Sequence, residues 1–327
     1  MKSFENIDAK NVRQAVTLLQ KFHQEKKSAA VVAGGSEYLQ LMKDRVVTPQ
    51  YLINLKTIPG LNYIREERNG FRIGALTTLT DIEEHKGIQE KLLLLSEAAA
   101  EAASPQIRNA GTIGGNICQR PFCWYFRSAS FTCLRKGGEI CYAVAGDNRY
   151  HAILGGGPSY IVHPSDMAPP LIALGARIKI TGPSGEKVIP LEKFFVLPQV
   201  DTKRENILAA DEIVTEIQIP HPKPGSKGFF HKVRERQAWD HAIVSVSTVV
   251  QSKGGICQDA RVVLGGVAPV PWRAPKAEDS LRGKKVDESS VQKVAEIALE
   301  GARPMKDNIY KVALAKSLIQ RALLASV

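Results

Sequence analysis

The chain has 327 residues, of which 44% are hydrophobic, 24% charged and 6% aromatic. This composition excludes a disordered chain, a collagen-like chain and a coiled-coil rod, and the length favours two domains. Lysine and arginine total 44 against 33 acidic residues, which gives a net charge of +11. The basic residues are scattered and no nucleic-acid-binding motif occurs, so we expect no nucleic-acid partner but a surface that docks an acidic subunit or attracts an anionic substrate.

The first hundred residues alternate between predicted helices and strands, which is typical of an α/β unit. The predicted elements are a helix over 11–27, a strand over 29–33, a helical turn over 37–43, a strand over 51–55, a hairpin over 63–75 that turns at Asn69-Gly70, a helix that Thr80 caps and a helix over 90–103. No run of about 18 apolar residues occurs, so we expect no membrane span. The first residues are charged, and we expect no secretory signal.

Residues 111–166 interrupt this alternation with a long, glycine-rich segment, and such loops are usually functional. A helix over 167–173 and strands over 176–181, 186–189 and 213–219 follow. The proline-rich stretch after His221 marks a domain boundary, so we predict one domain over 1–221 and a second over 222–327. The second domain is predicted as α+β, with strands over 243–251 and 259–264 and helices over 289–300 and 307–324.

Two glycine pairs follow apolar residues in the first domain. Gly34-Gly35 ends a predicted strand and precedes a helical turn, and Gly114-Gly115 follows Ile113. Glycines let backbone N–H groups approach a phosphate, and a helix N-terminus favours its negative charge. A plain turn is the commoner explanation for either pair alone, but two such loops could hold the two ends of a pyrophosphate. Neither pair lies in a Rossmann or P-loop motif.

Four of the five cysteines fall within one short segment, with spacings Cys118-x4-Cys123-x9-Cys133-x7-Cys141. Four thiolates can bind zinc or an iron–sulfur cluster. Structural zinc favours paired CxxC knuckles, which are absent here, so the irregular spacing favours a cluster. The alternative is that some of these cysteines are simply buried thiols.

Two charged segments have both functional and structural interpretations. Asp166 could cap the helix that follows it, or bind a sugar or ribityl hydroxyl. Lys232 lies ahead of a predicted strand, where charges normally form a solvated edge. His151 and His163 flank the glycine run, and either could be a ligand. No catalytic triad, HExxH motif or carboxylate pair is present, so we assign no catalytic side chain.

Several strings occur in a characteristic order along the chain. They are Ala33-Gly34-Gly35-Ser36-Glu37, Ile73-Gly74-Ala75-Leu76-Thr77-Thr78-Leu79, Ile107-Arg108-Asn109-Ala110-Gly111-Thr112-Ile113-Gly114-Gly115-Asn116, Pro164-Ser165-Asp166, Asp240-His241-Ala242-Ile243-Val244 and Leu264-Gly265-Gly266-Val267-Ala268. In this order they resemble the FAD-binding medium subunit of the molybdenum hydroxylases, such as xanthine dehydrogenase, carbon monoxide dehydrogenase, aldehyde oxidoreductases and 4-hydroxybenzoyl-CoA reductase. The resemblance covers nearly the whole chain.

The resemblance implies a FAD-binding fold of the vanillyl-alcohol-oxidase (PCMH) type, α+β overall with two α/β subdomains, plus a C-terminal α+β domain as in carbon monoxide dehydrogenase flavoproteins. It implies that the first glycine loop wraps the pyrophosphate, that the second lies beside FAD, and that Lys232 lies near the isoalloxazine ring. The implied FAD-binding residues are Val32, Ala33, Gly34, Gly35, Ser36, Glu37, Tyr38, Thr77, Thr112, Gly115, Asn116, Asp166 and Lys232.

The cysteine loop, about 117–161, resembles that of a subgroup with an extra [4Fe-4S] cluster, namely the FAD subunits of aldehyde oxidoreductase and 4-hydroxybenzoyl-CoA reductase. Cys123, Cys133 and Cys141 match three ligands of that subgroup. We place Tyr160 at the position of the fourth, where relatives have cysteine, and Cys118 could substitute for it. A three-iron cluster, a histidine ligand or a lost cluster are the alternatives.

The family resemblance implies an electron-transfer subunit without molybdenum, one that passes electrons between iron–sulfur clusters and an external acceptor or donor. Its implied partners are a molybdopterin-binding large subunit and a small [2Fe-2S] subunit, in a heterotrimer that could itself dimerise. The alternatives are an assembly subunit with a structural FAD site and a stand-alone flavin reductase. We expect a cytoplasmic location, with co-export to the periplasm through a partner's signal as the alternative.

Overall fold

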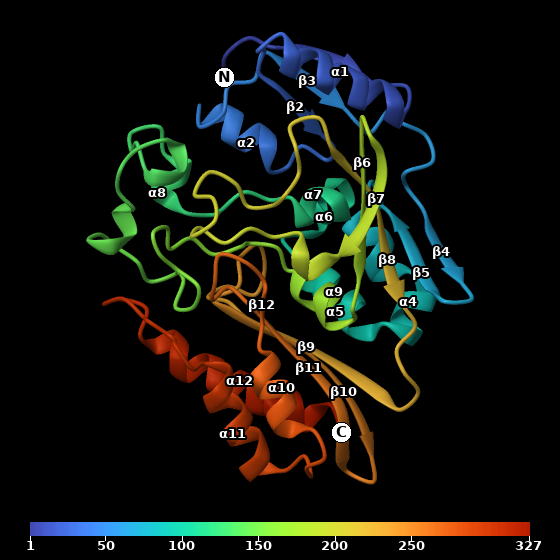
Figure 1. The fold of residues 1–327 in the computed structure, drawn as a ribbon, viewed down its shortest axis with the longest axis vertical. Helices are drawn as coiled ribbons and strands as arrows, with labels where there is room; N and C mark the ends of the chain where they lie inside the picture. Colours follow the sequence, from blue (N-terminus) through green and yellow to red (C-terminus); the bar gives the residue numbers. More distant parts are fainter.

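The computed structural model describes residues 1–327 and contains three β-sheets, each with helices packed against it (Figure 1). The first sheet is parallel and has the order β1-β3-β2. Its elements are β1 (Glu5–Asp8), α1 (Val12–Gln24), β2 (Ala29–Val32), α2 (Tyr38–Lys43) and β3 (Tyr51–Asn54). Asn11 caps α1 by accepting from the backbone N–H of Gln14, and Ala15, Val16, Leu19 and Phe22 form its buried face.

The second sheet is antiparallel, with the order β4-β5-β8-β6-β7. Its strands are β4 (Ile64–Glu67), β5 (Gly70–Gly74), β6 (Arg177–Gly182), β7 (Gly185–Pro190) and β8 (Ile213–Pro220). The helices of this part are α3 (Leu79–Glu84), α4 (Lys86–Lys91), α5 (Leu93–Glu101), α6 (Pro105–Ala110), α7 (Ile113–Ile117) and α9 (Ala168–Ala173), with a 3-10 turn over Leu191–Lys193. Residues of this sheet and of α3, α5, α7 and α9 form the largest apolar core of the chain, with 29 buried residues.

The C-terminal sheet is antiparallel, with the order β12-β11-β10-β9. Its elements are β9 (Ser226–Val233), β10 (Val244–Lys253), β11 (Ile256–Gly265), β12 (Trp272–Arg273), α10 (Pro275–Leu281), α11 (Glu288–Ala298) and α12 (Tyr310–Ala325). The three helices gather below the sheet in Figure 1, and α12 contacts β9 and β10. Phe230 and Val263 of this sheet belong to the core of the second sheet, so the C-terminal sheet is buried between its own helices and the rest of the chain.

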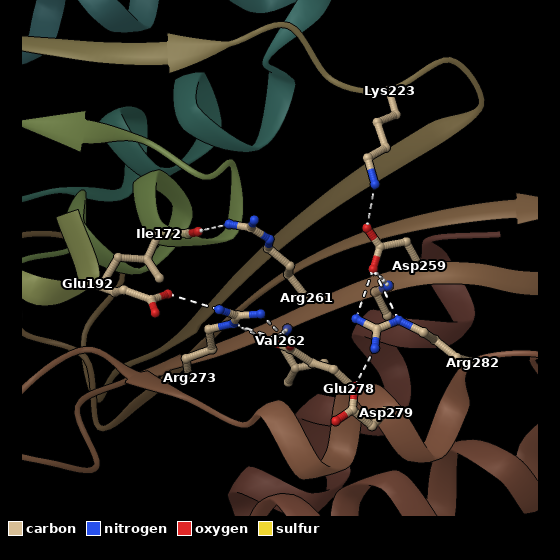
Figure 2. Close-up of polar contacts among 11 residues, drawn as sticks. Ile172, Glu192, Lys223, Asp259, Arg261, Val262, Arg273, Glu278, Asp279 and Arg282 are labelled. Carbon is tan, nitrogen blue, oxygen red and sulfur yellow. Dashed lines mark hydrogen bonds and ion pairs between the residues drawn. The ribbon is translucent and has the colours of Figure 1, made fainter. Parts of the chain in front are cut away.

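Ion pairs and hydrogen bonds reinforce this contact between the C-terminal sheet and the rest of the chain (Figure 2). Arg273 binds the buried carboxylate of Glu278 through Nε and Nη2, and its Nη1 donates to Glu192 at 3.0 Å. Arg261 donates to the backbone oxygen of Ile172 at 3.1 Å. Both arginines therefore link β11 and β12 to residues of the first 221 positions. Charge-assisted bonds of this kind hold two units in one orientation.

The cysteine loop lies at one side of the molecule, between α2 and α12 in Figure 1, and contains only short helices. These are α8 (Trp124–Arg127) and two 3-10 turns over Leu134–Lys136 and Tyr142–Val144. Buried polar contacts hold the end of this loop on the C-terminal domain. Lys311 of α12 is fully buried and donates to the backbone oxygens of Tyr150, His151 and Gly266.

Most predicted elements are confirmed, including the hairpin at Asn69-Gly70 and the antiparallel pairing of β10 and β11. Thr78, not Thr80, caps α3, because its hydroxyl accepts from the N–H of Asp81. The predicted helix over 90–103 is two helices that meet at Leu92. The strands β1 and β9 and the helix α10 were not predicted. None of the helices combines the length and the hydropathy needed to cross a membrane.

Candidate functional site

The two glycine loops predicted to lie beside a phosphate group are in direct contact. A Cβ on Gly34 would lie 2.1 Å from the backbone oxygen of Ala110, so only glycine permits this approach. Gly35 has φ +74°, in the left-handed region that favours glycine. It turns the chain from Val32 and Ala33 at the end of β2 toward α2, while Ser36 is exposed in the turn. The structure therefore brings together two loops far apart in the sequence.

The second loop presents an open glycine. Thr112 caps α7, and its hydroxyl accepts from the N–H of Gly115 at 3.2 Å. Gly115 is exposed, and a Cβ built on it would contact only this hydroxyl, at 3.1 Å. The side of Gly115 away from Thr112 is therefore free of protein atoms, as a phosphate or sugar in close approach would require.

Asn116 connects the second loop to the Pro164-Ser165-Asp166 segment. The hydroxyl of Ser165 donates to the Oδ1 of Asn116 at 2.6 Å and accepts from the N–H of Ala168 at 3.0 Å, at the start of α9. Ser165 was not among the predicted site residues. Its hydroxyl, not the carboxylate of Asp166, satisfies the first turn of α9, so the capping explanation of Asp166 is wrong.

Asp166 instead forms a buried ion pair with Lys232 of β9. The Nζ of Lys232 lies 2.8 Å from Oδ2 of Asp166 and also donates to the backbone oxygen of Glu101 at 3.0 Å. The Lys232 side chain is 0% exposed, so its interpretation as a solvated edge is wrong. Burial raises the pKa of Asp166, and the adjacent lysine counteracts part of that rise. Lys232 and Asp166 thus form an ion pair between the C-terminal domain and the first domain.

Thr77 is buried and already fully hydrogen-bonded within the protein. Its hydroxyl donates to the backbone oxygen of Tyr63 at 2.9 Å and accepts from the Tyr63 N–H at 3.1 Å. Its own backbone oxygen accepts from the N–H of Ile113. The contacts of Thr77 therefore position the second glycine loop, while those of Gly115 leave space beside that loop.

Side chains at the start of α2 connect the first glycine loop to the cysteine loop. Arg127 donates to the carboxylate of Glu37 at 2.5 Å, and its guanidinium lies 4.6 Å from the ring centre of Phe122. The ring of Phe122 packs at 4.2 Å from that of His241, in the C-terminal domain. Burial raises the pKa of Tyr38 to about 12. These contacts hold the cysteine loop against both the first glycine loop and the segment before β10.

Three of the four predicted metal-ligand cysteines converge. Cys123, Cys133 and Cys141 line one small cavity of about 10 Å³ together with Phe126, Ile161 and Ser159. All are free thiols, and burial raises the pKa of Cys123 to about 11, with Cys141 and Cys133 adding to this rise. No group of three or more His, Cys, Asp or Glu side chains lies close enough together to hold a single metal ion.

The structure does not bring Cys118 into this cavity. Cys118 packs against the core of the second sheet, and burial raises its pKa to about 12. Tyr160, at the predicted position of the fourth ligand, does not line the cavity either. A Cβ on Gly156 would lie 2.5 Å from the ring of Tyr160, so that ring packs against the glycine run. Both neighbours of Tyr160, namely Ser159, which is 1% exposed, and Ile161, line the cavity instead.

The two histidines that flank the glycine run have different surroundings. The Nε2 of His151 lies 3.3 Å from the sulfur of Cys123, and its Nδ1 has no partner. His163 packs edge-on against Phe195 and accepts from the N–H of Ser165 at 3.3 Å through Nδ1. Burial lowers the pKa of His151 to about 4 and that of His163 to about 3, so both rings are neutral near pH 7.

The fold and the paired glycine loops are those of a flavoprotein. Residues 2–222 match the family described as FAD binding domain in molybdopterin dehydrogenase, and residues 229–326 match the CO dehydrogenase flavoprotein C-terminal domain. The chain therefore belongs to the family of FAD-binding medium subunits of molybdenum hydroxylases, which are oxidoreductases.

Individual relatives agree with this assignment. The chain is 34% identical over 299 residues to the aldehyde oxidoreductase FAD-binding subunit PaoB of Escherichia coli, covering 90% of each chain. It is 30% identical over 328 residues to the carbon monoxide dehydrogenase medium chain of Hydrogenophaga pseudoflava, covering 99% of this chain and 96% of that one. A solved structure of carbon monoxide dehydrogenase from the same organism superposes with a TM-score of 0.79, at 30% identity, over 99% of this chain and 97% of that chain.

Proposed function

We propose that this chain is the electron-transfer subunit of a molybdenum hydroxylase complex, in which FAD passes electrons between iron–sulfur centres and an external acceptor or donor. The contact between the two glycine loops supports the proposal most directly. Gly34 lets the two loops touch, and Gly115 leaves room for a ligand to approach the backbone N–H groups at the start of α7. When bound, FAD would supply the redox chemistry, because no side chain of the site is itself a redox catalyst.

The residues around this site would bind and orient the cofactor. The first loop, over 32–38, would hold the pyrophosphate, and Thr112, Gly115 and Asn116 would lie along it. Thr77 would act by positioning Ile113, as its backbone contact indicates. The Lys232 cation would favour a reduced, anionic flavin, while Asp166 keeps that cation in place at 2.8 Å.

We also propose that Cys123, Cys133 and Cys141 bind an iron–sulfur cluster. Three thiols from three parts of one loop meet at a single cavity, and the other two, Cys118 and Cys257, lie at other cores. A cluster offers a separate iron to each thiolate, so its ligands stand farther apart than those of a single ion. The donor set fits a cluster, but the cavity would have to widen, since about 10 Å³ holds one water at most.

Partner subunits follow from the same assignment. A molybdopterin-binding large subunit and a small [2Fe-2S] subunit would carry the substrate chemistry and the first electron transfers. The net charge of +11 supports docking on acidic partners. The Glu37–Arg127 bond connects the glycine loop to the cysteine loop, so the two proposed cofactor sites lie on adjoining segments.

The test of electron transfer is a complex whose medium subunit binds FAD weakly and has been dialysed free of flavin. Gly115→Ala is suited to this, because its Cβ meets little protein. We expect the variant complex to assemble normally on size-exclusion chromatography but to lose turnover with a panel of aldehydes, the class named for the Escherichia coli relative. Full turnover without FAD would favour a structural flavin. Turnover of NADH by the isolated subunit would favour a flavin reductase.

The test of the cluster is an iron and acid-labile sulfide assay on anaerobically purified complex. We expect Cys133→Ser to lower the iron content of this subunit and to leave FAD bound. Cys257→Ser is the matched control, since Cys257 is equally buried but lies in the C-terminal core. Cys118→Ser should leave iron unchanged, because Cys118 lies outside the cavity. If the iron content is the same in the wild type and in Cys133→Ser, Cys133 is not a ligand.

A further inference from the structure

The wall of the three-cysteine cavity contains one more side chain with an oxygen donor. Ser159 lines the cavity beside Cys123, Cys133 and Cys141, and only 1% of its surface is exposed. The remaining polar side chains of the lining are Arg135, Tyr125 and Tyr142. Arg135 is paired with Glu205, and the hydroxyl of Tyr125 donates to the backbone oxygen of Asp147 at 3.2 Å. Ser159 therefore has the smallest oxygen-bearing side chain among the residues that line the cavity with the three thiols.

We infer that Ser159 provides the fourth protein ligand of the cluster, through Oγ, in place of a cysteine. The inference rests on the cluster proposed above and adds which atom completes it. A cubane has four irons and the chain offers three cavity thiolates, so one iron needs a different partner. A serine oxygen is a harder and weaker ligand for iron in a sulfide cluster than a thiolate is. The iron beside Ser159 is thus the one most easily lost.

The backbone around Ser159 holds it at the cavity independently of any metal. The backbone oxygen of Tyr160 accepts from the N–H of Ala152 at 2.9 Å, and that of Ser159 accepts from the N–H of Gly157 at 3.3 Å. The ring of Tyr160 lies over Gly156 on the other side of the chain. Alternation along this short extended segment directs Tyr160 away from the cavity and leaves Ser159 and Ile161 in its wall.

His151 is the other candidate for the fourth place. Its Nε2 contacts the sulfur of Cys123 at 3.3 Å, but the ring does not line the cavity that the three cysteines share. An N–H group at this distance from a ligand sulfur is positioned to donate a hydrogen bond to it, which tunes the cluster without ligating iron. The geometry therefore favours Ser159 as the ligand and His151 as a hydrogen-bond donor to Cys123.

The experiment measures how tightly the fourth iron is held in the purified complex. Oxidation by air should leave a three-iron cluster, seen by EPR. Ferrous iron added anaerobically with dithionite, which supplies the electron, should rebuild the four-iron form. We expect Ser159→Cys to lower the ferrous iron concentration that rebuilds the four-iron form by about tenfold or more. Ser159→Ala should raise that concentration about tenfold. Iron per protein after aerobic purification should rise from about three to about four in Ser159→Cys.

The possible outcomes distinguish a failure of the Ser159 ligand from a failure of the iron–sulfur cluster itself. A wild-type subunit without iron overturns the cluster and the role of Ser159 together. If wild type, Ser159→Cys and Ser159→Ala all hold a three-iron cluster and need the same ferrous iron concentration to rebuild the four-iron form, only the role of Ser159 is overturned. If His151→Gln raises the iron requirement in place of Ser159→Ala, His151 holds the fourth position. Bound FAD, measured from the flavin absorbance, confirms that each variant is folded.

Discussion

The Nζ of Lys232 lies 2.8 Å from Oδ2 of Asp166, and this pair joins two domains at the proposed flavin site. Asp166 precedes α9 in the first 221 residues, and Lys232 lies on β9 of the C-terminal sheet. Both side chains are almost fully buried, with 0% of the lysine and 8% of the aspartate exposed. A buried ion pair of this kind adds little net stability but is costly to break from one side.

Replacing Lys232 by methionine should destabilise the protein. The substitution leaves the carboxylate of Asp166 buried without its partner, which costs about 3–5 kcal/mol in the free energy of unfolding. Urea unfolding of flavin-free protein measures this loss. The double variant Asp166→Leu with Lys232→Met removes both charges and should recover most of it. A double variant no more stable than Lys232→Met would show that the two side chains are not coupled.

Replacing Gly115 by alanine should weaken FAD binding without weakening the fold. The added Cβ enters the open side of the loop and meets only the Thr112 hydroxyl within the protein, at 3.1 Å. We expect the dissociation constant of FAD to rise at least about tenfold, or 1.4 kcal/mol, measured by fluorescence titration. Gly87→Ala, in α4, is the control and should bind FAD normally. A Gly115→Ala protein with unchanged FAD affinity would place the cofactor elsewhere.

Local patterns in the sequence located both glycine pairs, because each directly follows an apolar residue. Only Gly35 has a left-handed φ, whereas Gly114 and Gly115 lie within α7. The partners of those loops could not be predicted in the same way. The Asn116–Ser165 and Asp166–Lys232 contacts join residues far apart in the chain and depend on how the domains pack. Ser159 was missed because residue spacing in an irregular loop does not say which of two neighbours faces inward.

The same limit explains the errors in secondary structure. The strand β9 carries Lys227, Lys232 and a glycine, so its sequence shows no clear apolar alternation, yet it pairs with β10 along eight residues of its length. Tertiary pairing overrode local propensity there. The short strand β1 is mostly exposed on its own and exists because β3 pairs with it in parallel.

Replacing Lys311 by methionine should loosen the end of the cysteine loop. The ammonium group donates to the backbone oxygens of Tyr150, His151 and Gly266, and burial lowers its pKa to about 7. Removing it leaves the backbone oxygens of Tyr150 and Gly266 without a donor, while that of His151 keeps the Asn308 amide, at a cost of roughly 2–4 kcal/mol. Hydrogen exchange should rise in residues 148–154. Lys316→Met, further along α12, is the control; equal exchange in both variants would contradict this role for Lys311.

Lowering the pH should destabilise the protein through His163. Burial lowers the pKa of His163 in the folded state to about 3, whereas an unfolded histidine has a pKa of 6.5. Between these values the unfolded chain binds a proton that the folded chain does not, so stability falls as pH decreases from 6.5. At pH 5.0 the expected loss from this residue is about 2 kcal/mol.

The measurement is the free energy of unfolding in urea at pH 7.5 and pH 5.0. The glutamine of His163→Gln cannot bind the proton. The free energy of unfolding of this variant should therefore fall less between pH 7.5 and pH 5.0 than that of the wild type, by about 2 kcal/mol. His23→Gln, on α1, is the control, because the side chain of His23 is exposed. A pH dependence of His163→Gln identical to the wild type would show that His163 is not buried in its neutral form.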